Sequence, residues 1–296
     1  MNQDILINDV KAKIASNLSI HIRELLPKHP IQEAYSYSLL PTGKLFRPML
    51  AVSLAKDLFK EFSYEKNLSS SSPLSYFCSF LETHHAYTLA HDDLPCMDND
   101  DFRRGKPSLH KAYNEWKALL IGDGLINFSY HLLAKTNHSS TKHILEIATR
   151  LLGPNGLILG QMLDLALDEK KPPTFLEILN IHMLKTSRLL QISLLGPYHL
   201  RRENNSSQFQ EEKYKMGHDL YKLGTYLGLL FQLLDDQSEM KSSLSLHEQK
   251  INAFYLYPKL AQESLHKYLE KTFSLLKKHQ LSNLEIYIND WYKRTS

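Results

Sequence analysis

The chain has 296 residues, 43% of them hydrophobic and only 11 of them glycine, and it carries a formal net charge of +3. This length and apolar content suffice for a sizeable core, whereas the small, dispersed positive charge argues against nucleic acid as the main partner. Two cysteines, Cys78 and Cys96, are too few for a disulfide framework, and no apolar run is long enough for a membrane span.

Apolar residues recur at helical spacing along the whole chain, which predicts an all-α fold with one domain over residues 1–296. The first predicted helix covers residues 4–26, and Pro27 and Pro30 end it. Because the segment Met1-Asn2-Gln3-Asp4 holds an early acidic residue and leads into no long apolar run, we expect no signal peptide and a cytoplasmic location.

Further helices are expected in chain order, with loops at Gly and Pro clusters. The serine-rich stretch Leu68 to Pro73 and the segment 201–208 are predicted loops, and Thr174 with Glu177 predicts a capping box. A polar loop at 240–251 and a helical tail complete the chain. The predicted helices between the first and the tail cover residues 49–58, 74–94, 116–133 and 142–152, a segment after Gly156, a segment after Thr174 and residues 214–236.

Two cations stand three residues apart in the segment Gly43-Lys44-Leu45-Phe46-Arg47-Pro48. On one face of a helix start, Lys44 and Arg47 would meet an anion. Surface cations at this spacing are common, so the ordinary reading of a solvated pair stays open.

The densest chemistry lies in residues 91–105, where five carboxylates precede Arg103 and Arg104. Carboxylate oxygens suit Mg²⁺, which fills its other positions with water and phosphate oxygens, and guanidinium groups suit the same phosphates. Pro95 would bend the helix end and let Asp98 turn back toward Asp92. The pattern therefore favours Mg²⁺ bridging the protein to a diphosphate, with a solvated acidic loop as the alternative.

A second acidic pair, Asp235-Asp236, ends the predicted helix 214–236, in which Gly224 and Gly228 allow a close approach. Two helices that each end in an aspartate pair would hold a metal between them across a bundle. On an earlier predicted helix, Gln161 and Asp164 share one face.

These motifs together resemble the trans-isoprenyl diphosphate synthases, and among them the bacterial farnesyl diphosphate synthase type. The resemblance covers residues 40 to 240. It rests on an ordered set of motifs: Gly43-Lys44-x-x-Arg47-Pro48, Asp92-Asp93-x-x-x-x-Asp98 with Arg103-Arg104-Gly105, Gly160-Gln161-x-x-Asp164, Lys185-Thr186 and Phe231-Gln232-x-x-Asp235-Asp236.

The resemblance implies a helical bundle around a central cavity, paired as a homodimer, that condenses isopentenyl diphosphate with allylic diphosphates. It implies two or three Mg²⁺ ions, with Mn²⁺ as a substitute, on Asp92, Asp98 and Asp235. The implied donors to the allylic diphosphate are Arg103, Lys185 and Gln232, and Lys185 with Thr186 is implied to lie near the developing cation. Those for isopentenyl diphosphate are Lys44 and Arg47, in the motif that begins at Gly43, together with His85 and Arg104.

Product length in such enzymes is limited by bulk below the first motif, and here Tyr87 stands five residues before Asp92. Its ring would stop growth at fifteen carbons, although a core tyrosine is an equally good interpretation.

The chain departs from the family pattern after Asp236. Glu239 replaces an aspartate, the following loop is shortened, and no lysine stands near Phe254, so that Lys241 or Lys250 would have to substitute. This departure keeps a second hypothesis open, an impaired homologue that acts as a partner subunit or binds prenyl diphosphates. A metal phosphohydrolase using His84, His85 or His91 with Asp92 is a third, which leaves the second aspartate pair unused.

Overall fold

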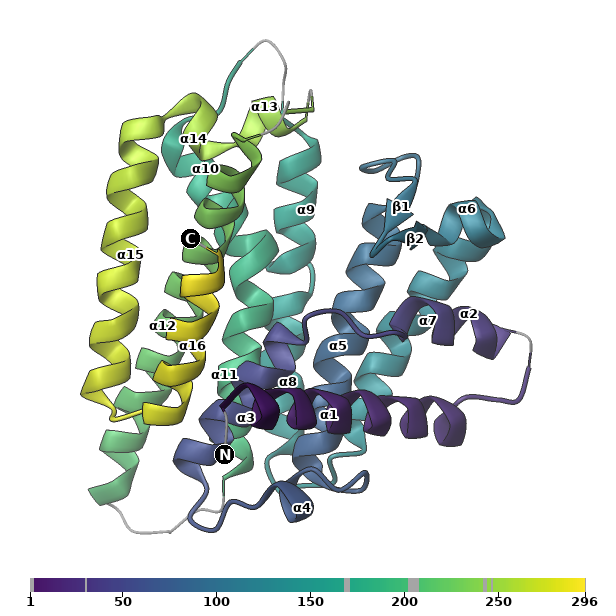
Figure 1. Cartoon of the computed structure of the whole chain (residues 1–296), viewed down its shortest axis with the longest axis vertical. Helices are drawn as coiled ribbons and strands as arrows, with labels where there is room; N and C mark the ends of the chain where they lie inside the picture. The colour runs from purple at the N-terminus through teal and green to yellow at the C-terminus, as the bar shows by residue number, and fades with distance from the viewer. Residues whose placement is uncertain are drawn as a thin grey trace. The chain divides into compact units, whose positions relative to one another are not determined.

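The computed structural model describes residues 3–29, 31–167, 171–201, 208–241, 244–245 and 247–295. Regular structure in these residues is almost entirely helical, and the one sheet they form has two short strands (Figure 1). The predicted all-α class is confirmed. Within the described residues, every helix is either too short or too polar to cross a membrane.

The contacts divide the chain into two compact units. The first comprises Met1–Val52 and Phe59–Leu145, and the second comprises Ser53–Leu58 and Glu146–Ser296. The single domain expected over residues 1–296 stays a prediction.

The elements up to residue 152 are α1 Gln3–Leu25, α2 Ile31–Leu39, α3 Phe46–Leu58, α4 Tyr64–Asn67, α5 Pro73–Asp92, β1 Phe102–Arg103, β2 Lys106–Pro107, α6 Leu109–Tyr113, α7 Glu115–Ala134 and α8 Thr141–Leu152. In the first unit, α5 packs along α7, and α1 and α2 pack against α5. The aromatic side chains of Phe77 and Phe80 on α5 are fully buried, because the apolar sequence of this helix leaves little polar surface to face water.

The later elements are α9 Leu157–Leu165, α10 Phe175–His182, the π-helix η1 Met183–Ser187, α11 Arg188–Leu200, α12 Gln208–Glu239, α13 Glu248–Ile251, α14 Ala253–Leu256, α15 Pro258–Lys278 and α16 Ser282–Thr295. In the second unit, α12 packs against η1, α11 and α15 (Figure 1). A buried apolar cluster joins α10, α12, α14 and α15, and includes Ile178, Leu230, Leu233, Phe254 and Leu265.

Local sequence signals explain several boundaries. The Ser72 side chain accepts the N–H of Ser75 and Pro73 opens α5, and the predicted capping box of Thr174 and Glu177 is confirmed at α10. The predicted polar loop 240–251 is wrong at its end, because residues 248–251 form α13. Most of the predicted loop 201–208 lies outside the described residues, and Gln208 already belongs to α12.

Candidate active site

The first aspartate motif lies where α5 ends. The N–H of Leu94 donates to the carbonyl of His91 at 3.1 Å, and the N–H of Asp98 donates to the carbonyl of Asp92 at 2.9 Å. The predicted return of Asp98 toward Asp92 is therefore confirmed for the backbone. Asp92 is half-buried and Asp98 is exposed, so both are near solvent at one end of the helix.

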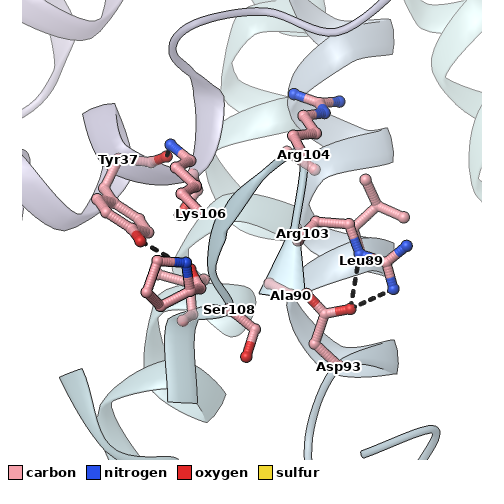
Figure 2. Close-up of a pocket in the computed structure, with 12 residues that line it drawn as sticks. Tyr37, Leu89, Ala90, Asp93, Arg103, Arg104, Lys106 and Ser108 are labelled. Atoms are coloured by element: carbon pink, nitrogen blue, oxygen red, sulfur yellow. Dashed lines mark hydrogen bonds and ion pairs between the residues drawn. The ribbon is translucent and has the colours of Figure 1, made fainter. Parts of the chain in front are cut away.

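Asp93 has a different environment from its neighbour Asp92. Its side chain is buried, and Arg103 donates to Asp93 Oδ1 from Nε at 2.8 Å and from Nη2 at 2.5 Å. Arg103 Nη2 also donates to Asp100 at 2.5 Å. Burial raises the pKa of Asp93, and Arg103 opposes this only in part. Figure 2 shows Asp93 and Arg103 pointing toward each other while Arg104 points away.

Arg103 and Arg104 are presented by a β-hairpin that the sequence analysis missed. In β1 and β2, Arg103 pairs with Lys106, so Arg104 and Gly105 form a two-residue turn with φ of 54° and 77°. Such turns need left-handed backbone at both central residues, which glycine adopts without strain. Lys106 Nζ donates to the carbonyls of Leu40, at 2.9 Å, and Tyr37. These bonds tie the hairpin to the end of α2.

The Arg104 side chain enters a cationic cluster in the first unit. It donates to the buried carboxylate of Glu82 at 3.3 Å. A Cβ on Gly43 would lie 2.9 Å from Arg104 Cζ, so a larger residue there would displace the guanidinium group. Glu82 was not predicted, although a carboxylate inside an apolar helix signals a paired charge.

Arg47 and His85 complete this cationic cluster. Burial lowers the pKa of Arg47 to about 10, while Glu82 raises it and Arg104 lowers it. Burial, followed by Arg47 and Arg104, holds the pKa of His85 well below its usual value. The buried Nε of Arg47 has no hydrogen-bond partner among the described residues. The cluster therefore has donors that a phosphate group would satisfy.

Lys44 does not share a helix face with Arg47. It is exposed, and α3 begins only at Phe46, after Leu45 has adopted a left-handed φ of 54°. That part of the prediction is wrong.

Tyr87 is buried on α5, one turn before His91. Its ring meets those of His84 and His91 edge to face, with centroids 4.7 and 5.7 Å apart. Burial raises the pKa of the Tyr87 hydroxyl, so the side chain is neutral and apolar in character at neutral pH.

In the second unit, Lys185 and Thr186 lie on the π-helix η1, a distortion that is frequent at functional sites. Lys185 Nζ donates to Asp164 Oδ2 at 2.6 Å, and the Thr186 hydroxyl donates to Gln232 Oε1 at 3.0 Å. A Cβ on Gly160 would clash with the backbone nitrogen of Lys185. Gly160 thus lets α9 approach η1 closely enough for the lysine–aspartate pair.

Gly224 and Gly228 make the predicted close approach on α12. A Cβ at Gly224 would lie 2.6 Å from Cα of Gln191, and one at Gly228 would clash with the side chain of Ser187. These positions set the spacing of α12 against α11 and η1, and so the place of Gln232 beside Thr186.

The two residues of the second aspartate pair differ in exposure. Asp236 is buried and accepts the N–H of Ala253 at 2.8 Å, with His182 Nε2 at 3.1 Å. Asp235 is exposed. Burial raises the pKa of Glu239 to about 7, and Asp235 and Asp236 add to this, against a hydrogen bond from Asn252.

The carboxylates near solvent offer the oxygen donors that Mg²⁺ prefers. Among the residues that the structure describes, no three His, Cys, Asp or Glu side chains form a ready cluster for a metal.

Comparisons with known proteins agree on one family. A family model described as polyprenyl synthetase matches residues 28–251. Farnesyl diphosphate synthase from Geobacillus stearothermophilus is 32% identical over 255 residues, which cover 83% of this chain and 76% of that protein. Geranylgeranyl pyrophosphate synthase 3 from Arabidopsis thaliana chloroplasts is 34% identical over 238 residues, covering 77% and 60%. The solved geranyltransferase from Helicobacter pylori, complexed with magnesium and isoprenyl diphosphate, matches with a TM-score of 0.80 at 29% identity, covering 97% of each chain.

Proposed function

The chain belongs to the polyprenyl synthetase family and is a trans-prenyltransferase; we propose that it condenses isopentenyl diphosphate with dimethylallyl and then geranyl diphosphate to give farnesyl diphosphate. The observation that carries the proposal is the backbone bond from Asp98 to Asp92 at the end of α5. It keeps two carboxylates at one helix end, while Arg103 neutralises the intervening Asp93.

The proposed metal ligands are Asp92, Asp98 and Asp235. Asp98 and Asp235 are exposed and Asp92 is half-buried, which supports this choice over the buried Asp93 and Asp236. Two or three Mg²⁺ ions are proposed, and Mn²⁺ would substitute. When bound, Mg²⁺ neutralises charge on the diphosphate that leaves.

For the allylic diphosphate, the proposed donors are Arg103, Lys185 and Gln232, and Thr186 is proposed to lie beside the reacting carbon. Lys185 is aimed by its bond to Asp164, and Thr186 by its bond to Gln232. As the carbon–oxygen bond breaks, these donors stabilise charge on the departing oxygen. Oxygen atoms of Thr186 and of the backbone near Lys185 lie close to the developing allylic cation in this proposal.

For isopentenyl diphosphate, the proposed site is the cationic cluster of Arg47, His85 and Arg104, together with Gly43 and Lys44. Its support is the Arg47 Nε that lacks a partner among the described residues, and the absence of a Cβ at Gly43 beside Arg104. Holding the alkene near the cation lets a carbon–carbon bond form. The released diphosphate then accepts the proton that the new allylic product loses.

The fifteen-carbon product is proposed from Tyr87, whose buried ring lies one turn before the aspartate motif. The family contains enzymes of more than one product length, so this assignment is separate from the reaction type. The proposal also includes a homodimer in the cytoplasm, as expected from the sequence.

One assay separates the synthase from both alternatives. The purified protein is incubated with Mg²⁺ and geranyl diphosphate, with and without isopentenyl diphosphate. Released phosphate, released diphosphate, prenyl products and the binding of geranyl diphosphate are measured. A synthase forms product only with both substrates. Phosphate release from geranyl diphosphate alone would indicate a phosphohydrolase, and binding without turnover would indicate a partner subunit or binding protein.

A further inference from the structure

A basic side chain lies beside each of the two carboxylate oxygens of Asp164. Lys185 Nζ lies 2.6 Å from Oδ2, and His247 Nε2 lies 3.2 Å from Oδ1. The aspartate side chain is 3% exposed, whereas those of Lys185 and His247 are 29% and 40% exposed. Lys185, and His247 when it is protonated, compensate this buried carboxylate. Burial raises the pKa of Asp164, but the two partners outweigh it and the net pKa lies below the usual value.

His247 comes from the segment where the family pattern is broken. It directly precedes α13, and the N–H of Lys250 donates to its carbonyl at 2.9 Å. After α13, Asn252 Nδ2 donates to the carbonyl of Asp236 at 2.9 Å and to Glu239 at 3.0 Å. The segment is thus fastened both to α9 and to the end of α12.

The lysine on η1 has two competing demands. Lys185 neutralises the buried Asp164, and under the proposed function it also donates to the allylic diphosphate. A buried carboxylate that loses its cation is destabilised. If Lys185 were the only cation beside Asp164, it would therefore stay bound to Asp164 rather than donate to the diphosphate. A second cation on the other oxygen removes this penalty and makes ammonium donors available to the substrate.

We propose that His247 is a positioning residue for the reaction: protonated, it shares the charge of Asp164 and so releases Lys185 to bind the allylic diphosphate. The proposal rests on the proposed function. His247 does not touch the substrate in this scheme; it acts through Asp164.

The scheme depends on the charge of the imidazole, which changes near neutral pH. His247 faces Asp164 on α9 and, beyond it, Lys185 on η1. Glu248 follows in its own segment, where its carboxylate is bonded to the N–H of Ser245, and Glu239 is held by Asn252 at the end of α12. Rising pH removes the proton from His247, and Lys185 then compensates Asp164 without the charge of the imidazole.

The test compares His247→Ala and His247→Lys with wild type in steady-state assays from pH 6 to 8.5. At low pH, His247→Ala raises KM for geranyl diphosphate about three- to tenfold, with KM for isopentenyl diphosphate unchanged. Wild-type KM for geranyl diphosphate climbs toward the His247→Ala value as pH rises. His247→Lys keeps the low KM across the range, because the lysine stays charged. The matched control is His266→Ala, an exposed histidine on α15 that bonds within its own helix.

A double-mutant cycle with Asp164→Asn tests the route of action. In the Asp164→Asn background, His247→Ala no longer changes KM for geranyl diphosphate. Equal effects in both backgrounds, or a KM rise that His247→Lys does not reverse, would overturn the inference.

Binding of inorganic diphosphate with Mg²⁺, measured by calorimetry, separates this inference from the proposed function. If the wild-type protein forms no prenyl product, the proposed function is contradicted. The diphosphate affinities of wild type, His247→Ala and His247→Lys then still decide the role of His247. The inference predicts weaker diphosphate binding for His247→Ala and wild-type binding for His247→Lys. Identical affinities would overturn it.

Discussion

Arg103 donates two hydrogen bonds to one oxygen of Asp93, from Nε at 2.8 Å and from Nη2 at 2.5 Å. This pair fastens the β-hairpin to the end of α5. We expect Asp93→Asn to lower the free energy of unfolding by about 1–2 kcal/mol, because a charge-assisted pair with a buried carboxylate is lost while Arg103 keeps Asp100. Denaturant unfolding checks this. An unchanged midpoint would show that the pair does not stabilise the hairpin.

Glu82 orients Arg104 and offsets the repulsion between Arg104 and Arg47. We expect Glu82→Gln to raise KM for isopentenyl diphosphate roughly tenfold, since a charged hydrogen bond is worth about 1.5–3 kcal/mol and part of it positions the guanidinium. KM for geranyl diphosphate should stay near wild type. Glu65→Gln, an exposed residue on α4, is the control. Equal rises in both KM values would argue against a separate isopentenyl diphosphate site at this cluster.

Tyr87 is the proposed limit on product length. Tyr87→Ala is expected to give products longer than fifteen carbons, because removing the buried ring opens space one turn before Asp92. The cavity also destabilises the protein, by about 3–5 kcal/mol for loss of a large aromatic side chain, so products are analysed well below the unfolding temperature. Tyr87→Phe keeps the ring and should keep the wild-type product. A fifteen-carbon product from Tyr87→Ala would show that the ring only packs in the core and does not limit product length.

Asp219 on α12 forms pH-dependent ion pairs with residues at the end of α15. Lys278 Nζ and His279 Nε2 lie 2.6 and 2.9 Å from its Oδ2. Burial raises the pKa of Asp219, but the two partners outweigh it and the net pKa is lowered. A carboxyl with a depressed pKa stabilises the fold above its ordinary pKa and loses this contribution as pH falls through the folded value.

We therefore expect Asp219→Asn to lower the free energy of unfolding by about 1 kcal/mol at neutral pH. This value is small because Lys278 is largely exposed. The difference from wild type should shrink as pH falls below 3.8, the ordinary value. Asp290→Asn, which breaks a surface pair with Arg294 on one helix, is the comparison. A difference in the free energy of unfolding between wild type and Asp219→Asn that grows toward acid pH would contradict the prediction.

Much of the site follows from local signals in the sequence. Pro95 after the Asp92-Asp93 pair predicts the chain reversal that the bond from Asp98 to Asp92 shows. The capping box at Thr174 and the close approaches at Gly224 and Gly228 are likewise set by neighbouring residues and by the absence of a Cβ.

Other features depend on packing that no local pattern encodes. Strands of two residues show no periodicity in the sequence, so the β-hairpin whose turn contains Arg104 was not predicted. The close approach of α9 to the π-helix at Gly160 joins segments that are distant in the sequence. His247 meets Asp164 in a segment that Asn252 connects to the end of α12. The sequence shows that the family lysine is missing from this segment. It does not show that His247 pairs with Asp164.

The central claim is tested most directly by the turnover of Asp92→Asn with Mg²⁺, isopentenyl diphosphate and geranyl diphosphate, beside wild type and Asp101→Asn. Asp101 belongs to the same acidic stretch but pairs with Lys111 at 2.8 Å. The account predicts that Asp92→Asn loses about a hundredfold or more in kcat, with an unchanged unfolding midpoint, that Asp101→Asn stays close to wild type, and that chelation of Mg²⁺ stops all three. Wild-type turnover by Asp92→Asn, or turnover that survives chelation, would contradict it.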